Sequence, residues 1–176
     1  MQRFTTTPNK PFPSVHVLVS LFLMVLSFLL ILFNVTINPY FAHAGSVVGN
    51  GFKNYLFGTM EGDTILGMAG NDRLFGLAGA DKIYGGSGDD IIEGDQGNDY
   101  LSGEDGNDLI IGGQDADKIL GGNGDDILLG SYAVNSSSVR DYAKDSIMCG
   151  LGNDTAYISL EDNDTASGDC ENIISN

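Results

Sequence analysis

The sequence predicts an all-β fold in which short repeats stack into one array. Eight nine-residue units run end to end over residues 58–129, each with Gly at the first place, Asp at the sixth and Leu or Ile at the eighth. A ninth, weaker copy begins at Gly49 and has Asn54 at its sixth place. The first six places are rich in Gly, Asn and Asp, which favour turns, and the last three centre on a branched apolar residue, which favours a short strand.

Each unit offers one apolar residue that it cannot bury by itself. Because side chains alternate across a strand, the eighth-place side chain faces away from the seventh and ninth. Stacked neighbours must therefore supply the core. We expect the eighth-place residues to form a single inward-facing ladder, made of Leu56, Ile65, Leu74, Ile83, Ile92, Leu101, Ile110, Ile119 and Leu128.

The units resemble the G-G-x-G-x-D-x-U-x nonapeptide of the RTX, or hemolysin-type, calcium-binding repeat proteins. The resemblance covers residues 49–130 and, more loosely, the tail as far as Asn176. It implies a right-handed parallel β-roll, an RTX-type β-solenoid, in which two units make one turn, two parallel sheets face each other and the turns stack along two edges. In that family, calcium ions lie between successive turns, held by loop carbonyls and the sixth-place aspartates.

The resemblance also implies which residues bind calcium, the one cofactor expected, as several ions. Carboxylates stacked about 4.8 Å apart repel each other unless a cation lies between them, and Ca²⁺ accepts irregular, carbonyl-rich ligand sets. The first edge would carry Asp72, Asp90, Asp108 and Asp126, and the second edge Asp63, Asp81, Asp99 and Asp117. Further expected ligands are Gly85, Gly88, Gly103, Gly106, Gly121, Gly124, Asn71, Asp89, Asn107, Asp125 and, in an isolated last copy, Asp154.

The two edges differ in sequence. The first edge has Gly at every fourth place and Asn or Asp at every fifth place, whereas the second has substitutions at both, among them Glu61, Asp115, Ala80 and Ala116. We therefore expect tight, cooperative calcium binding along the first edge and weaker or partial binding along the second. The alternative is that all turns bind alike, because carbonyls supply much of a calcium shell.

Residues 1–44 differ from the rest, since they contain no Gly, Asp or Glu. A basic start, an apolar run over 17–33 and the small-x-small sequence that ends at Ala44 predict an export signal cleaved after that residue. The alternative is an uncleaved signal-anchor helix, because the run extended over 15–35 is close to the roughly 20 residues that span a bilayer. In both cases the repeats would be extracellular, either secreted or attached to the cell surface.

Beyond the roll of residues 45–130, residues 131–176 are expected to form a loop, a last degenerate repeat from Cys149 and a capping segment. The form of this tail resembles the closing segment of short secreted calcium-binding proteins. Cys149 and Cys170 are the only cysteines. In an exported chain such a pair favours a disulfide, and a metal or redox pair is the alternative.

Charge and composition narrow the function. From residue 45 onward the chain has six basic residues and all 24 acidic ones, which leaves a formal charge of −18 and argues against binding nucleic acid. Both histidines lie within residues 1–44, so the exported part lacks the usual general base and we expect no enzyme. The prediction is an extracellular calcium-binding protein whose folding depends on the ion.

The alternative function is a surface or matrix adhesion module that uses the roll as a calcium-stabilised scaffold. Ninth-place residues such as Phe57, Phe75 and Leu129 form an outward apolar stripe that would contact a protein or cell-surface partner, unless the chain's own ends cover it. A membrane would be contacted only through an uncleaved N-terminal segment. An ice-binding face is disfavoured because the seventh and ninth places are mixed and charged.

Overall fold

The computed structural model describes residues 45–131, 143–161 and 163–175. The predicted signal or anchor segment, residues 1–44, lies outside the described residues. Within the described ranges all regular structure is β-strand, arranged as two seven-stranded parallel sheets. No helix in this part of the chain is long and apolar enough to cross a membrane.

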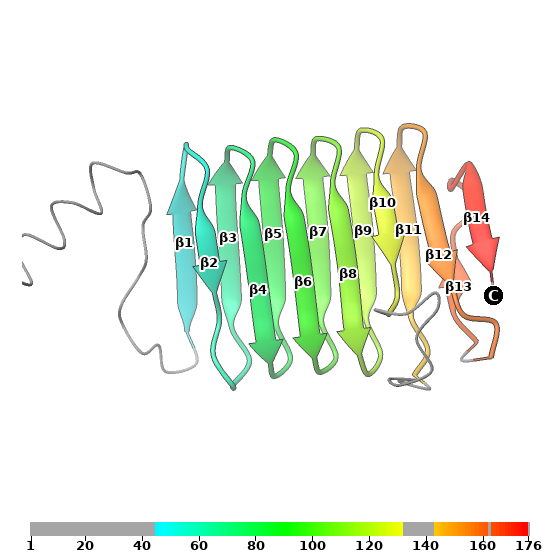
Figure 1. Ribbon diagram of the computed structural model, residues 1–176, viewed down its shortest axis with the longest axis horizontal. Coiled ribbons are helices and arrows are strands. Elements are labelled where there is room, and N and C mark those ends of the chain that lie inside the picture. The colour runs from blue at the N-terminus through cyan, green and yellow to red at the C-terminus, as the bar shows by residue number, and fades with distance from the viewer. Residues whose placement is uncertain (1–44, 132–142, 162, 176) are drawn as a thin grey trace, which may run out of the picture. The chain divides into compact units, whose positions relative to one another are not determined.

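The strands alternate between the two sheets along the sequence, and the strands of one sheet point opposite to those of the other (Figure 1). Sheet A contains β1 (Ser46–Asn50), β3 (Thr64–Ala69), β5 (Lys82–Ser87), β7 (Tyr100–Asp105), β9 (Lys118–Asn123), β11 (Ser146–Leu151) and β13 (Thr165–Ala166). Sheet B contains β2 (Tyr55–Phe57), β4 (Arg73–Ala78), β6 (Ile91–Gln96), β8 (Leu109–Gln114), β10 (Ile127–Leu129), β12 (Thr155–Ile158) and β14 (Asn172–Ser175).

The register confirms a parallel solenoid in which two units make one turn. Ile65 pairs with Ile83 in sheet A, and Leu74 pairs with Ile92 in sheet B, each 18 residues along the chain. The strands are longer than the three residues expected. Most central ones span six, because the first three places of the next unit continue the pairing. The turn between sheets is therefore confined to places four to six.

The inward ladder is confirmed. Every predicted eighth-place side chain is buried, with at most 4% of its surface exposed. Val47, Ile147, Cys149 and Ala156 extend the same core cluster toward the two ends of the array. Because each residue packs on the one in the turn before and after it, the core is as long as the stack of turns and only two side chains wide.

The array continues past the lapse in the repeat. Ser146 of β11 pairs with Lys118 of β9, 28 residues away rather than the usual 18, so ten extra residues are inserted without breaking sheet A. The segment expected to cap the array instead adds one more strand to each sheet, β13 and β14, and all four residues of β14 are exposed. A separate capping structure is not confirmed.

The outward apolar stripe is present on sheet B. The Phe57 ring, which is 55% exposed, stacks on the Phe75 ring with 4.9 Å between their centroids. Leu129 lies farther along the same face and is partly buried. The role of this stripe as a contact surface stays a prediction.

The turns require glycine for two separate reasons. From residue 68 to residue 124, second- and fourth-place residues have positive φ, which glycine tolerates. Met68, Leu77, Asp95 and Glu104 nevertheless occupy second places with φ of 76° to 83°. First-place glycines have no positive φ but lie tightly against the neighbouring turn. A Cβ at Gly103, for example, would collide with a carboxylate oxygen of its own turn and lie 2.6 Å from a carbonyl oxygen of the next.

Replacing Gly103 with alanine is therefore expected to destabilise the calcium-loaded roll by about 1–3 kcal/mol, the usual cost of overpacking a close-packed site. Gly168→Ala is the matched control, because a Cβ there meets nothing within 4 Å. Urea unfolding in calcium measures both. Equal unfolding midpoints for the two variants would contradict the close approach at the first place.

Candidate metal centre

The sixth-place aspartates are buried at the two edges of the roll. Asp63, Asp72, Asp81, Asp90, Asp99, Asp108, Asp117, Asp126 and Asp154 each expose at most 3% of their surface. The strand register stacks them in two columns, one per edge, with 18 residues between most neighbours. The structure thus brings together the predicted carboxylates of each edge. Burying a carboxylate is costly unless its oxygens find partners.

One oxygen of each carboxylate is used to link the turns. The Oδ1 atom accepts a hydrogen bond from the backbone N–H of the sixth-place residue one turn earlier. On the first edge this N···O distance is 2.7 Å from Asp72 to Asp90 and 2.8 Å from Asp90 to Asp108. On the second edge it is 2.8 Å from Asp81 to Asp99 and 2.9 Å from Asp99 to Asp117. We call each such series an aspartate ladder.

The second oxygen of most of these carboxylates has no hydrogen-bond partner. This holds for the buried Oδ2 atoms of Asp72, Asp81, Asp90, Asp99, Asp108, Asp126 and Asp154. Asp63, at the start of the second edge, differs because its Oδ2 accepts bonds from the N–H and hydroxyl of Thr59. Asp63 stays a predicted ligand, but its carboxylate is already satisfied by the protein.

Burial changes the acidity of these groups. It raises the pKa of Asp99 and of Asp108 to about 7, and that of Asp90 and Asp126 to about 6, while hydrogen bonds from the preceding turn act in the opposite direction. Repulsion from the neighbouring carboxylates adds to the rise. The ionised form of the ladder is thus disfavoured in the protein alone, and a cation beside the Oδ2 atoms would favour it.

The donor set at this position fits a hard divalent cation. Among the described residues, no three His, Cys, Asp or Glu side chains form a metal cluster, so an ion would take several ligands from the main chain. First-place carbonyls stack close to the aspartates: the carbonyl oxygens of Gly103 and Gly121 lie over Gly85 and Gly103 respectively. Fourth-place carbonyls stack similarly, with the carbonyl of Gly88 against Gly106 and that of Gly106 against Gly124. Oxygen-only, carbonyl-rich sites are those that Ca²⁺ accepts.

The fifth-place side chains of the first edge are exposed, and their role as calcium ligands stays a prediction. Side-chain oxygens of Asn71, Asp89, Asn107 and Asp125 accept backbone N–H bonds from the fifth place of the next turn, on the exposed side of the first edge, at 2.8 to 3.3 Å. They form a second, outer ladder. On the second edge Asn98 makes the corresponding bond to Ala116, whereas Gly62, Ala80 and Ala116 have no side-chain oxygen.

Three members of the aspartate ladders escaped the sequence analysis. Asp145 accepts the N–H of Asp117 at 2.9 Å across the insertion, and Asp164 accepts that of Asp145 at 3.0 Å. Glu171 accepts the N–H of Asp154 at 2.9 Å. Only places six to eight of the repeat remain recognisable there. In Asp145-Ser-Ile and Asp164-Thr-Ala an aspartate still stands two residues before an apolar residue.

Cys149 and Cys170 form a disulfide, with 5.1 Å between their Cα atoms. This is the pairing that the sequence favoured. Cys149 is buried and occupies a first place, where the preceding units have glycine.

Comparison with known families identifies the repeats. The family of the RTX calcium-binding nonapeptide repeat (4 copies) matches residues 57–92 and again residues 93–128. These two matches meet without a gap and cover the central turns described above. No protein of curated function matches the chain.

The raised pKa values predict how the calcium-free fold responds to pH. The folded chain retains protons that the unfolded chain releases near pH 4, so its stability falls as pH rises through about 6 to 7. In chelator, circular dichroism should therefore show more β-structure at pH 5 than at pH 8. The double variant Asp99→Asn, Asp108→Asn should show a flatter pH dependence. A β-structure content that rises with pH in chelator would contradict the assignment.

Proposed function

We propose that this chain, which carries RTX calcium-binding nonapeptide repeats, is an extracellular calcium-binding protein whose roll folds around several calcium ions. The observation that carries the proposal is the row of buried aspartates, each with one oxygen held by the preceding turn and most with the other lacking a hydrogen-bond partner. A cation between the turns would neutralise the stacked charge. The sixth-place carboxylates and the first- and fourth-place carbonyls would hold it.

Folding of the roll would depend on the ion. Each glycine in regular structure costs about 0.5–1 kcal/mol relative to alanine, mainly in chain entropy, and the buried carboxylates oppose folding when they are ionised. Since the stacked site does not exist in the unfolded chain, calcium-binding free energy becomes folding free energy. Weak extracellular calcium sites, with Kd of about 10⁻⁴ to 10⁻³ M, would keep the chain unfolded inside the cell and fold it outside.

Two features support an extracellular location. The Cys149–Cys170 disulfide belongs to an oxidising compartment, and residues 1–44 have the composition of an export signal or anchor. A non-enzymatic role is supported by the chemistry of the roll. From residue 45 onward the sequence contains no histidine, and the acids that could act in pairs are the ladder carboxylates.

The direct test is a calcium titration followed by far-ultraviolet circular dichroism, with magnesium as the control ion. We expect a cooperative gain of β-structure in calcium but not in magnesium, because Mg²⁺ demands near-octahedral geometry and keeps its waters. Asp108→Asn should shift the transition to higher calcium, whereas Asp105→Asn, on the exposed third place of the same turn, should not.

Two results would reject the proposal. One is a chain with full β-structure in chelator at pH 8 and no response to calcium. The other is an equal shift for Asp108→Asn and Asp105→Asn, because it would mean that general surface charge rather than the ladder binds the ion.

The difference between the edges leads to a separate prediction. The outer ladder adds backbone bonds between fifth places along the first edge, so these hydrogen bonds offset part of the cost of ordering the turns and should strengthen calcium binding there. In a calorimetric calcium titration, Asp108→Asn on the first edge should therefore weaken the binding phase of highest affinity. Asp99→Asn on the second edge should weaken a phase of lower affinity. Indistinguishable effects on both phases would favour turns that bind alike.

A further inference from the structure

We propose that the array ends in an additional calcium site, built from the carboxylates of Asp154 and Glu171, which the Cys149–Cys170 disulfide closes. The site lies beyond residue 128, where the match to the RTX repeat ends. The inference rests on the proposed function, since it extends the same kind of binding to residues that the repeat pattern does not include.

Asp154 provides the buried, unsatisfied ligand. Its side chain is completely buried, and its Oδ1 atom accepts the backbone N–H of Asp126 at 2.8 Å. Its Oδ2 atom is buried without a hydrogen-bond partner. Asp154 therefore repeats, in the last full turn, the arrangement of the central turns, in which one carboxylate oxygen is hydrogen-bonded and the other is buried without a partner.

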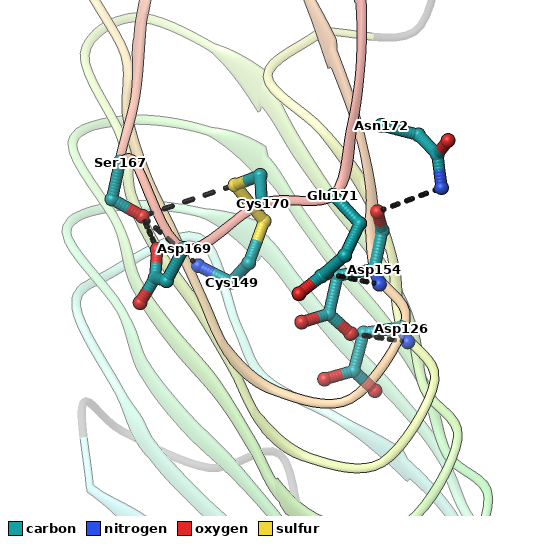
Figure 2. Close-up of a disulfide and its surroundings, with 8 residues drawn as sticks. All are labelled: Asp126, Cys149, Asp154, Ser167, Asp169, Cys170, Glu171 and Asn172. Atoms are coloured by element: carbon teal, nitrogen blue, oxygen red, sulfur yellow. Dashed lines mark hydrogen bonds between the residues drawn. A yellow bond between two sulfur atoms is a disulfide. The ribbon is translucent and has the colours of Figure 1, made fainter.

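Glu171 replaces the aspartate that would follow. Its Oε2 atom accepts the N–H of Asp154 at 2.9 Å, the bond that an aspartate makes in every preceding turn of this edge. Only 17 residues separate Glu171 from Asp154, one fewer than in a central turn. The extra methylene of glutamate offsets the shorter path. Figure 2 shows the side chains of Asp126, Asp154 and Glu171 following one another in this order.

Cys149 joins the carbonyl column to the disulfide. Its carbonyl oxygen lies against Gly121 on the Asp126 side, as the Gly121 carbonyl lies against Gly103, so the first-place column of oxygens ends one turn before the proposed site. Its Sγ atom is bonded to Cys170, the residue before Glu171 (Figure 2). Cys149 carries a side chain where the preceding first places have glycine, and the adjacent strand β13 ends at Ala166, before the residue that would lie opposite Cys149.

The disulfide therefore controls the position of the last ligand. Glu171 precedes β14, an exposed strand at the edge of sheet B that is paired on one side to β12. Such a terminal strand frays easily. The covalent bond holds Glu171 beside Asp154, so calcium binding at this end would require the oxidised pair, whereas the central turns bind independently of it.

Hydrogen exchange on the full chain, read peptide by peptide across a calcium titration, tests this site. In the unaltered chain we expect calcium to protect both residues 57–128 and residues 172–175. Glu171→Gln should raise the calcium concentration that half-protects 172–175 by at least about tenfold, since even outer-shell metal partners alter affinity by 10- to 100-fold. The double variant Cys149→Ala, Cys170→Ala should act likewise. Asp169→Asn, an exposed neighbour of Glu171, is the matched control and should leave it unchanged.

The outcomes separate this inference from the proposed function. Calcium protection of 57–128 together with a calcium-independent 172–175 segment, or equal curves for Glu171→Gln and Asp169→Asn, would overturn the terminal site alone. A chain in which calcium protects neither region would overturn the proposed function itself. Protection of 57–128 also shows that each variant has folded.

Discussion

The structure depends on one constraint, the burial of an acidic side chain in every half-turn of the roll. A carboxylate that is 0–3% exposed must have its charge and its oxygens compensated. The backbone N–H of the preceding turn satisfies one oxygen, as from Asp90 to Asp108. That bond also fixes the distance between successive turns, because the same residues that pair in the sheets are linked at the edge. Sheet pairing and side-chain satisfaction therefore stabilise the same stacking.

The glycine pattern follows from this arrangement. The free carboxylate oxygen lies against the Cα atom of its own first-place residue, so a side chain there would occupy the place of the oxygen. Positive φ at the second place is a softer requirement, since Leu77 and Glu104 meet it at the cost of some backbone strain. The first place of the final turn differs because Cys149 has no complete strand beyond it. Its side chain can therefore leave toward Cys170.

Much of this was predictable from the sequence because the repeat has a single period. The inward ladder from Leu56 to Leu128 and the stacking of sixth-place aspartates follow once each unit is known to make half a turn. The period could not predict the ladder residues that lie beyond the regular nine-residue spacing. Asp145 lies after ten extra residues, Asp164 follows a degenerate turn, and Glu171 is of another residue type. These side chains are recognised only when the strands on either side are seen to remain in register.

At the fifth place the repeat pattern is regular, but residue type alone does not reveal what the side chain does. Asn71, Asp89, Asn107, Asp125 and Asn153 alternate between amide and carboxylate along the first edge. These residue types predicted calcium binding, which stays a prediction. One side-chain oxygen of each residue from Asn71 to Asp125 accepts a hydrogen bond from the backbone of the next turn. Residue type alone does not distinguish a ligand from a turn-stabilising group, since both use the same oxygen atoms. Burial does separate the two ladders, because the fifth-place side chains are exposed and the sixth-place carboxylates are buried.

Burial therefore divides the acidic residues of this chain into two populations with different energetic roles. Exposed carboxylates such as Asp105 and Asp125 are screened by water and salt, and they keep the folded chain soluble without strongly opposing its formation. The ladder carboxylates do not have that screening, and desolvation raises their pKa. In the folded roll a proton or a cation would compensate their charge. Because the pKa of Asp99 and Asp108 is about 7 and that of Asp90 and Asp126 about 6, the ladders lose their protons as pH rises through this range, and under the proposed function calcium would then supply the compensating charge.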